Sequence, residues 1–518
     1  MSEPAPESEP ASGEVRVFAQ YERDFREEAD VVVVGSGPTG AIVCYELARR
    51  GARVILLEEG PPFTPADFDL DGSRSMARTM REGGLRTTFG TVMPTMQAIC
   101  LGGGSLVNSA ICPRPPAFVF DGWSREYELS RTSRESLDPH FDRVAELIGI
   151  APTPENVLGR RNTLFRDGCK ELGYSSEPMP RNVVGCRGSG ECFTGCRTRA
   201  KQSMDVSLIP AAIALGARVL TSVQVQEVVA DGLRVQGVRG QVVEPITGRR
   251  SHRFRVDARF VVLAAGCMAT PVLLQKSGGL ANGSGQVGRN LQFHPGVAVA
   301  GVFPDPVEPQ FGATQGYQSL EFLDQGFKLE TLWAPPAVIA VRSPGFGHEL
   351  QERFAELPRM AVWDAIGSTH RSLGSVRARR GSSLDPILTW QLDPADLEIL
   401  KKALVVLSEI FFAAGAQKVV PGVQRQAHEM HSLAETQRLL GPEVKHHDLV
   451  FGGNHAFCTT RMHGDPKRGV VDELGRCHDL DNLYIADTGI FPRCSSVNPM
   501  FTGMALAHRQ AEALADRL

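Results

Sequence analysis

The sequence predicts an α/β fold in which helices cover a largely parallel sheet and a second domain packs against it. Three hydrophobic runs support this prediction: one at 29–34 leads into a glycine-rich turn and a helix, one at 53–57 ends in acidic residues, and one at 261–266 ends in small residues. Continuous apolar runs of this kind are typical of strands buried on both faces of a parallel sheet. The chain has 518 residues, which is too long for one ordinary core, so we expect two packed domains.

The first run and its turn have the pattern of a dinucleotide-binding site. Gly35, Gly37 and Gly40 follow the strand at 29–34 in the order G-x-G-x-x-G and open a helix. The first glycine permits a tight turn, the second lets the backbone approach a pyrophosphate, and the third lets the helix pack on the strand. The helix N-terminus favours phosphate, and Glu58, at the end of the second strand, is placed to accept hydrogen bonds from ribose hydroxyls. The pattern predicts a dinucleotide without separating FAD from NAD.

Composition and charge exclude several classes of partner. The chain has 55 Lys and Arg against 59 Asp and Glu, a formal net charge of −4, so no basic field attracts nucleic acid or an anionic membrane. No apolar run reaches the roughly 18–20 residues that span a bilayer. Residues 1–28 are acidic, rich in Pro, Ser and Glu, and lack the features of a signal peptide. We therefore predict a disordered tail at 1–28 and a cytoplasmic location.

Further motifs follow one another along the rest of the chain. They are GGGSLVN at 102–108, AAGCMATPVLLQKSG at 264–278, VGRNLQFHP at 287–295, HAFCT at 455–459, ADTGIFP at 486–492 and VNP at 497–499. In this order they resemble the glucose–methanol–choline (GMC) family of FAD-dependent oxidoreductases, along nearly the whole chain after the tail. The resemblance implies an FAD-binding Rossmann-type domain interleaved with an α+β substrate domain built on an antiparallel sheet.

The resemblance also implies how the chain is divided between these domains. The FAD-binding domain would take 29–150, 200–300 and 446–518, and the substrate-binding domain with its cap segments would take 151–199 and 301–445. The apolar spacing at 395–414 predicts a helix of the substrate domain.

Contacts to the cofactor are implied residue by residue. Gly35, Gly37 and Gly40 would contact the pyrophosphate, Glu58 the adenosine ribose, Val225 and Ala265 the adenine, Gly102, Gly103, Ser105 and Asn108 the isoalloxazine and ribityl chain, Asp487 the ribityl–phosphate end, and Asn498 and Pro499 the pyrimidine edge of the flavin. Family members with a histidyl–flavin bond carry His directly before the Asn of the GGGS loop. This chain has Val107 there, which predicts non-covalent FAD.

His455 and Asn498 are the implied catalytic pair for oxidation of a CH–OH group to an aldehyde or ketone. A neutral imidazole accepts a hydroxyl proton near neutral pH, and the amide of Asn498 hydrogen-bonds and orients the alcohol oxygen. The hydride would pass to flavin N5 while His455 acts as base. His446, His447 and His463 are alternative bases without the motif register, and a structural role for His455 is the alternative to a catalytic one.

Four residues near this pair depart from the family pattern. Cys267 replaces a small residue, Ala456 and Cys458 replace the common Pro and Gly, and His463 replaces a Gly. These departures leave the substrate type undetermined and do not affect the prediction of the cofactor.

The substrate class is only weakly indicated by the sequence. Few carboxylates flank the motifs, which gives little support to a cationic substrate, and aromatic residues could wall an apolar pocket, although single aromatics are more often core. These aromatics are Trp333, Phe346, Trp363 and Trp390. We expect a small-molecule alcohol of bulky or lipophilic character, with oxygen or another electron acceptor as the second substrate.

Three cysteines lie close together in a glycine-rich segment. Cys186, Cys192 and Cys196 fall within eleven residues, with a spacing similar to that of GMC-type glucose dehydrogenase subunits that carry a three-iron cluster. Three thiols are an incomplete ligand set for zinc and a partial one for an iron–sulfur cluster. We predict no metal here, and the alternative is an iron–sulfur-linked dehydrogenase that passes electrons to a partner.

Other functions remain open for the same chain. One is a lyase of the GMC fold in which FAD is structural. Another is a NAD-linked dehydrogenase that uses only the glycine fingerprint. The last is a non-catalytic flavin-binding subunit, which the intact His455–Asn498 pair disfavours.

Overall fold

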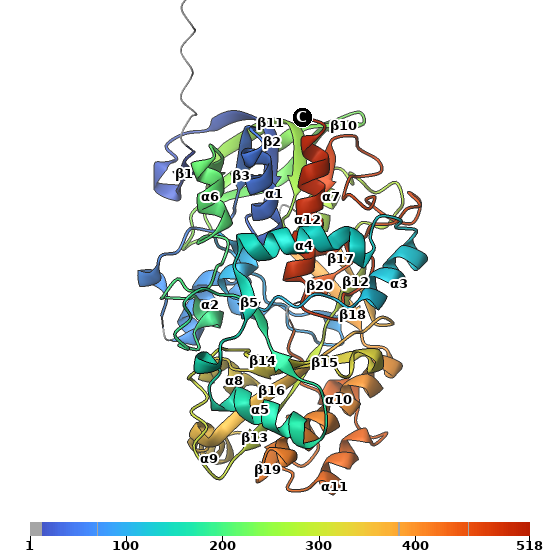
Figure 1. The fold of residues 1–518 in the computed structure, drawn as a ribbon. Coiled ribbons are helices and arrows are strands. Elements are labelled where there is room, and N and C mark those ends of the chain that lie inside the picture. Colours follow the sequence, from blue (N-terminus) through green and yellow to red (C-terminus); the bar gives the residue numbers. More distant parts are fainter. Residues whose placement is uncertain (1–12, 70, 382–383, 454) are drawn as a thin grey trace, which may run out of the picture.

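The computed structural model describes residues 13–518 apart from 70, 382–383 and 454. In this part of the chain, a mostly parallel sheet with its helices occupies the upper half of Figure 1, and an antiparallel sheet with α5 and α10 occupies the lower half. The predicted combination of a Rossmann-type domain with an α+β domain built on an antiparallel sheet is therefore confirmed.

The first sheet has eight strands in the order β1-β8-β3-β2-β11-β10-β9, with β21 beside β11. From β1 to β11 neighbouring strands are parallel, as are β11 and β21, whereas β10 and β9 extend the sheet antiparallel. The strands are β1 (Val15–Arg16), β2 (Phe25–Val34), β3 (Val54–Leu57), β8 (Arg218–Leu220), β9 (Val223–Asp231), β10 (Arg234–Val243), β11 (Arg250–Leu263) and β21 (Leu483–Ile485). The glycine turn after β2 therefore opens at the edge where its parallel neighbours also end.

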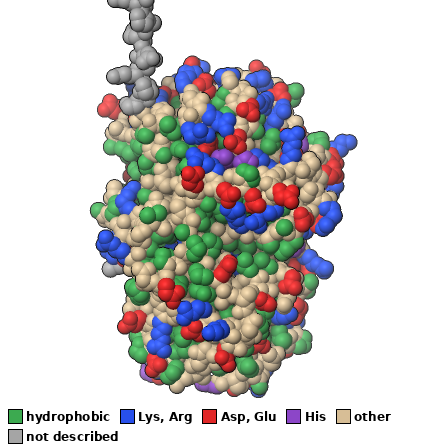
Figure 2. Space-filling model, in the orientation of Figure 1, with side chains coloured by type: hydrophobic (Ala, Val, Ile, Leu, Met, Phe, Trp, Pro, Cys, Tyr) green, Lys and Arg blue, Asp and Glu red, His purple; other side chains and the backbone are tan. Residues whose placement is uncertain are grey.

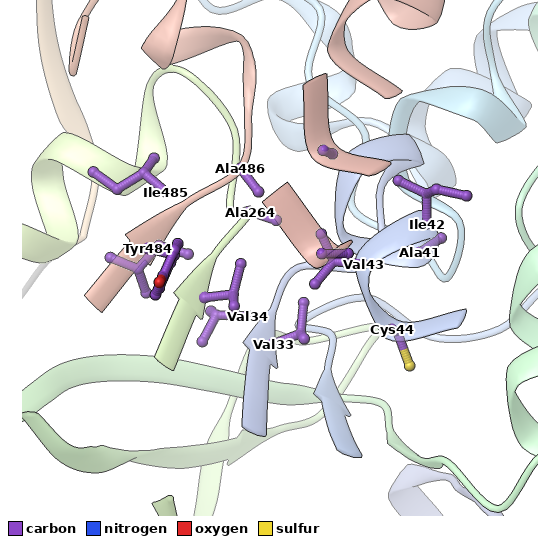
Figure 3. Close-up of a cluster of buried hydrophobic side chains, with 14 of the residues drawn as sticks. Val33, Val34, Ala41, Ile42, Val43, Cys44, Ala264, Tyr484, Ile485 and Ala486 are labelled. Carbon is purple, nitrogen blue, oxygen red and sulfur yellow. The ribbon is translucent and has the colours of Figure 1, made fainter. Parts of the chain in front are cut away.

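The helix α1 (Pro38–Arg49) begins directly after this turn. Gly37 is its N-cap and Pro38 its first residue, a position that proline favours because its missing N–H would have no partner there. Figure 3 shows side chains of β2, α1, β21 and the end of β11 in one buried cluster, including Val33, Val34, Ile42, Val43 and Ala486. The all-apolar run of β2 is thus buried on both faces, as a central parallel strand requires.

The predicted disordered tail at 1–28 is wrong over its described part, and residues 1–12 lie outside the described residues. Val15–Arg16 forms β1, which pairs with β8, and β2 begins at Phe25. The rings of Tyr21 and Phe25 stack with centroids 5.3 Å apart, and Tyr21 is buried. These contacts offset the entropy of ordering the segment, which the average composition of the tail does not reveal.

The second sheet has six antiparallel strands in the order β19-β13-β16-β15-β14-β6. They are β6 (Glu177–Pro178), β13 (Gly296–Val302), β14 (Tyr317–Ser319), β15 (Phe327–Leu332), β16 (Met360–Gly367) and β19 (Lys418–Val420). The helix predicted at 395–414 is confirmed as α10 (Pro394–Ala413), which packs against β13 and β16. The Asp393 carboxylate begins this helix by accepting a hydrogen bond from the Ala395 amide at 2.8 Å.

A third sheet of five strands has the order β20-β12-β17-β18-β4. Its strands are β4 (Phe89–Gly90), β12 (Arg289–Phe293), β17 (Leu373–Ala378), β18 (Pro386–Gln391) and β20 (Ala456–Phe457). Figure 1 shows it at mid-height, between the two larger sheets. It combines segments that the sequence assigns to both domains, so the two domains share hydrogen-bonded strands, and the domain boundaries themselves stay a prediction.

The remaining helices surround these sheets, and β5 (Ile150–Pro152) pairs with β7 (Pro180–Asn182) in a separate ribbon. The helices are α2 (Gly72–Thr79), α3 (Ala117–Tyr127), α4 (Arg134–Leu147), α5 (Arg160–Glu171), α6 (Leu208–Ala214), α7 (Ala269–Lys276), α8 (Pro336–Arg342), α9 (His348–Ala355), α11 (Leu433–Thr436) and α12 (Met500–Ala515). Among the residues described, none of the helices has both the length and the apolar character needed to cross a membrane.

Candidate active site

A cavity of about 540 Å³ is lined by both large sheets. Beyond the carboxyl ends of β2, β3 and β11 its wall is made of loops, which is where open α/β sheets bind ligands. Its opposite wall comes from β13, β15, β16 and α8. Many of the predicted cofactor residues line it, namely Gly35, Gly37, Glu58, Gly103, Asn108, Val225, Ala265, Asp487, Asn498 and Pro499. Gly40, Gly102 and Ser105 are outside this lining.

The glycine turn leaves backbone open to the cavity at one position. Gly35 has φ +103°, and a Cβ on it would lie 2.3 Å from the Ala264 carbonyl oxygen. A Cβ on Gly40 would lie 2.0 Å from the Gly35 carbonyl oxygen, so this glycine allows α1 to pack on β2. A Cβ on Gly37 would have no atom within 4 Å. An open backbone in front of a helix N-terminus fits a pyrophosphate.

Glu58 lies buried at the end of β3 and faces the same cavity. Its carboxylate accepts hydrogen bonds from the Ser36 amide at 3.0 Å, the Ser36 hydroxyl at 2.6 Å and the Gly60 amide at 2.8 Å. Burial raises the pKa of Glu58, although these donors oppose the effect. The Ser36 oxygen also accepts from the Gly102 amide at 2.9 Å. Sequence reasoning missed Ser36 because it occupies a variable position of the fingerprint.

The second glycine loop lies against the first. A Cβ on Gly103 would lie 2.7 Å from the Cα of Gly37, so a side chain at Gly103 would push the two backbones apart. The Ser105 hydroxyl donates to the Gly102 carbonyl at 2.6 Å and holds the loop in shape. Asn108 follows on the cavity wall.

Asp487 joins the end of β11 to the segment after β21. It accepts hydrogen bonds from the Thr270 hydroxyl at 2.5 Å, the Gly266 amide at 3.1 Å and the Gly489 amide at 2.8 Å. Burial raises the pKa of Asp487 to about 6, against the effect of these donors. The residue thus fixes two loops of the cavity wall.

His455 lines the cavity from the segment before β20. Its Nδ1 lies 3.4 Å from Nδ1 of His294, and its backbone oxygen accepts from the His294 amide at 3.2 Å. Burial lowers the pKa of His455 to about 4, with Glu330 opposing and Lys328 adding to the effect. The imidazole is therefore neutral at pH 7 and able to accept a proton.

The three alternative bases, all within the described residues, lie outside the cavity lining. His463 Nδ1 accepts a hydrogen bond from the Asp465 amide at 2.9 Å, and His447 Nε2 lies 2.7 Å from Arg425 at the surface. His446 lies beside His447 in a short helical turn. Of the four candidates, the structure brings His455 to the predicted cofactor residues.

Asn498 lines the cavity and directly precedes Pro499, which is the N-cap of α12. Its Oδ1 accepts a hydrogen bond from Lys328 Nζ at 2.8 Å. Because an ammonium group only donates, it holds the amide oxygen and directs the amide NH₂ group away from itself. Sequence reasoning missed this partner.

Lys328 belongs to a buried set of charged residues on the antiparallel sheet. Lys328 and Glu330 alternate on one face of β15, and their side chains are paired at 2.8 Å with 0% exposure. Asp364 lies directly opposite Glu330 on β16, and both residues line the cavity. Burial raises the pKa of Asp364, and Glu330 adds to the effect. Charges at alternate positions of the run FKLETL at 327–332 are the sequence signal for this set.

Aliphatic side chains form much of the remaining wall. They include Val297, Val299, Val338, Ile339, Val362 and Leu404. The four aromatic residues considered for the pocket wall do not form it. Trp333, Trp363 and Trp390 are buried in the core, Phe346 is 88% exposed, and none of these four is part of the lining. Trp363, for example, stacks on Phe411 with ring centroids 3.6 Å apart.

The three clustered cysteines are free thiols with separate partners. Cys192 Sγ accepts from Arg181 at 3.1 Å, and Cys196 Sγ lies 3.3 Å from the Thr198 hydroxyl. Their sulfur atoms, with that of Cys186, are not all within 4.8 Å of one another, so the set does not form a site for a single ion. The prediction of no metal at this cluster stays a prediction.

Comparisons with known proteins identify the family. Residues 76–296 and 370–507 match the N-terminal and C-terminal models of GMC oxidoreductases. The chain belongs to the GMC oxidoreductase family. The predicted membership is confirmed, and with it the class of enzyme, an FAD-dependent oxidoreductase. Residues 30–98 also match the pyridine nucleotide-disulphide oxidoreductase model, which covers the glycine turn.

Relatives of this GMC oxidoreductase include both uncharacterized and named proteins. An uncharacterized GMC-type oxidoreductase of Mycobacterium tuberculosis is 33% identical over 92% of this chain and 74% of its own length. A long-chain-alcohol oxidase of Arabidopsis thaliana is 29% identical over 95% of this chain and 68% of its own. The crystal structure of pyridoxine 4-oxidase from Mesorbium loti has a TM-score of 0.69 at 19% identity, covering 93% of this chain and 98% of that one. This structural likeness shows the fold.

Proposed function

We propose that this GMC oxidoreductase oxidises a CH–OH group of a small-molecule alcohol to an aldehyde or ketone, with His455 as the base. The observation that carries the proposal is that His455 and Asn498 line the same cavity as the open glycine turn. FAD, when bound, supplies the acceptor for the hydride. The residues that would hold it are the cofactor residues of the cavity lining, and the open backbone at Gly37 fits its pyrophosphate.

The proposed role of His455 requires its Nδ1 to carry the proton shared in the contact with His294. With a proton on Nδ1 of His455 directed at Nδ1 of His294, 3.4 Å away, Nε2 keeps its lone pair. A neutral imidazole in this tautomer takes the hydroxyl proton as the carbon–hydrogen bond breaks. The low pKa of His455 keeps it in the accepting form at neutral pH.

The contact with Lys328 supports the role of Asn498. Its amide oxygen is engaged by the ammonium group at 2.8 Å, so its Nδ2 is the atom available to the alcohol oxygen. A hydrogen bond from Nδ2 would fix the direction of the substrate oxygen and leave its proton to His455.

The aliphatic part of the wall supports a bulky or lipophilic alcohol as substrate, since apolar surface favours apolar chains. The long-chain-alcohol oxidase among the relatives supports the same class and favours oxygen as acceptor. Another electron acceptor remains the alternative to oxygen, and a cytoplasmic location stays a prediction.

Non-covalent FAD is supported by Val107, which lines the cavity beside Asn108 and has no nucleophilic atom. Acid precipitation of the purified protein tests this point. We expect the yellow colour to stay in the supernatant. Flavin that stays with the precipitate would show a covalent bond elsewhere.

Replacing His455 with alanine tests the proposed base. We expect the rate of anaerobic flavin reduction by an alcohol to fall by about 10²–10⁴-fold, the usual contribution of a general base, while the flavin spectrum is retained. An unchanged rate in stopped-flow measurements would remove His455 from the mechanism. A wild-type flavin that no alcohol bleaches would favour a lyase with structural FAD, and iron in the purified protein would favour the iron–sulfur-linked dehydrogenase.

A further inference from the structure

At a place away from the cavity, three helices bring two histidines and two glutamates together. His140 comes from α4, His508 and Glu512 lie one turn apart on α12, and Glu46 comes from α1. Figure 2 shows histidine side chains at the surface in the region where α4 lies across α1 and α12 in Figure 1. None of these four side chains is used by the proposed reaction.

Three side-chain atoms of this group face one point. The Nδ1 atoms of His140 and His508 are 2.9 Å apart, and Glu512 Oε2 lies 3.4 Å from the first and 3.9 Å from the second. A point equidistant from these three atoms lies about 2 Å from each, which is the length of Zn–N and Zn–O bonds. Two imidazoles and a carboxylate make three of the four ligands of a tetrahedral site, and water completes the set.

Glu46 lies on the Nε2 side of the His508 ring. Its Oε1 lies 3.5 Å from His508 Nε2 and is a buried oxygen without a hydrogen-bond donor among the described residues. Its second oxygen accepts from Arg49 at 2.8 Å. A carboxylate behind a histidine keeps the proton on the far nitrogen and turns the lone pair of the near one toward the metal.

The surroundings of Glu512 leave one of its carboxylate oxygens to this group. Arg50 pairs with Oε1 of Glu512 at 3.0 Å, which leaves Oε2 directed at the two histidines. Among the described residues, no other group of three His, Cys, Asp or Glu side chains converges in this way.

We propose that His140, His508 and Glu512 bind one divalent transition-metal ion, such as zinc, with Glu46 orienting His508. The ion would connect α4 to α12 directly and to α1 through Glu46. The N-termini of α1 and α12 both border the cavity, through Pro38 and Met500. The site is structural, and it stands independently of the alcohol-oxidising reaction.

Zinc titration of the FAD-loaded enzyme tests this proposal after a chelator has been used and removed. Binding is followed by competition with a chromophoric zinc indicator and by the thermal midpoint. Because thiols elsewhere bind zinc as well, the comparison is between the wild type and variants. We expect His140→Ala to lose one zinc equivalent and the accompanying rise in thermal midpoint. We expect Glu46→Gln to keep the equivalent with about 10–100-fold weaker affinity, as for other residues that orient a ligand.

His348→Ala is the matched control. His348 is exposed and lies 3.3 Å from Glu352 one turn along α9, so this variant removes a histidine from another His–Glu pair and should bind zinc as the wild type does. His140 is only partly buried, and an unchanged flavin spectrum and circular dichroism verify that its variant is folded. The proposal is overturned if the wild type and His140→Ala bind the same number of zinc ions with equal affinity.

Discussion

Replacing Lys328 with methionine removes the ammonium group that holds both Glu330 and Asn498, with little change in side-chain volume. Both members of the Lys328–Glu330 pair are 0% exposed. Removing one partner of a buried ion pair costs about 3–5 kcal/mol, because the remaining charge is buried without compensation. We expect the free energy of unfolding of Lys328→Met to fall by this amount, measured by urea denaturation of the FAD-loaded enzyme.

The double variant Lys328→Met, Glu330→Gln is the control for this loss. It removes the orphaned carboxylate, so most of the lost stability should return, and the coupling between the two sites follows from the double-mutant cycle. If Lys328→Met were as stable as the wild type, the claim that Lys328 and Glu330 form a buried ion pair would be refuted.

The same substitution should slow the chemistry through Asn498. A hydrogen bond to a charged group contributes about 1.5–3 kcal/mol. We therefore expect flavin reduction to slow by about 10–100-fold when the Asn498 amide loses its hydrogen bond from Lys328.

The pH dependence separates this effect from general damage to the structure. Lys328 lowers the pKa of His455 and Glu330 raises it, so the acid limb of the reduction rate should move to higher pH in Lys328→Met and to lower pH in Glu330→Gln. Shifts in the same direction in both variants would contradict the arrangement.

Three further predictions follow from the site. Gly37→Ala should fold normally and hold FAD weakly, because its Cβ meets no atom of the chain within 4 Å but would crowd a pyrophosphate bound at the turn. Gly40→Ala should also lower stability, because its Cβ would meet the Gly35 carbonyl oxygen at 2.0 Å. Thermal midpoints and flavin content of the two variants check this. The free energy of unfolding should fall as pH is lowered from about 6.5 to about 4. His455 and His370 have pKa values of about 4 in the folded state and 6.5 as their ordinary value, so the unfolded chain binds more protons in that window. A free energy of unfolding that stays constant across this range would contradict the burial of these imidazoles. Ser36→Ala should lower the thermal midpoint and FAD affinity modestly, since it removes the hydroxyl that links Glu58 to the second glycine loop, and calorimetric titration with FAD measures the change.

Local patterns made the Rossmann half of the molecule predictable. The run at 31–34 is buried on both faces, and Gly35 and Gly40 are required by contacts within a few residues of the chain or with the neighbouring strand. The helix at 395–414 was also predictable from a local pattern, because the spacing of its apolar residues indicates which face of the helix is buried. The antiparallel sheet came from the resemblance to the family, since the pairing of β15 with β16 depends on segments far apart in the sequence.

The residues that sequence reasoning missed act through partners distant in the chain. Lys328 gains its role at the site because Asn498, distant in the chain, accepts a hydrogen bond from it, and Ser36 gains its role because the Gly102 amide reaches it. The N-terminal segment was misjudged for a related reason: β1 becomes a strand by pairing with β8. The question of an aromatic wall stayed open in the sequence, and large rings such as Trp363 fill the core rather than the cavity, as single aromatics more often do.

The cavity takes its lining from Val34 at one end of the chain to Met500 near the other, and this sets the order in which a newly made molecule acquires its cofactor. The glycine turn leaves the ribosome long before Asp487 and Asn498 have been synthesised. Until β21 adds to β11 and α12 settles beside α1, a nascent chain has half a binding site and an uncovered apolar face. We therefore expect flavin capture to be a late event of biogenesis, and a cell short of flavin to accumulate chains that chaperones and proteases recognise.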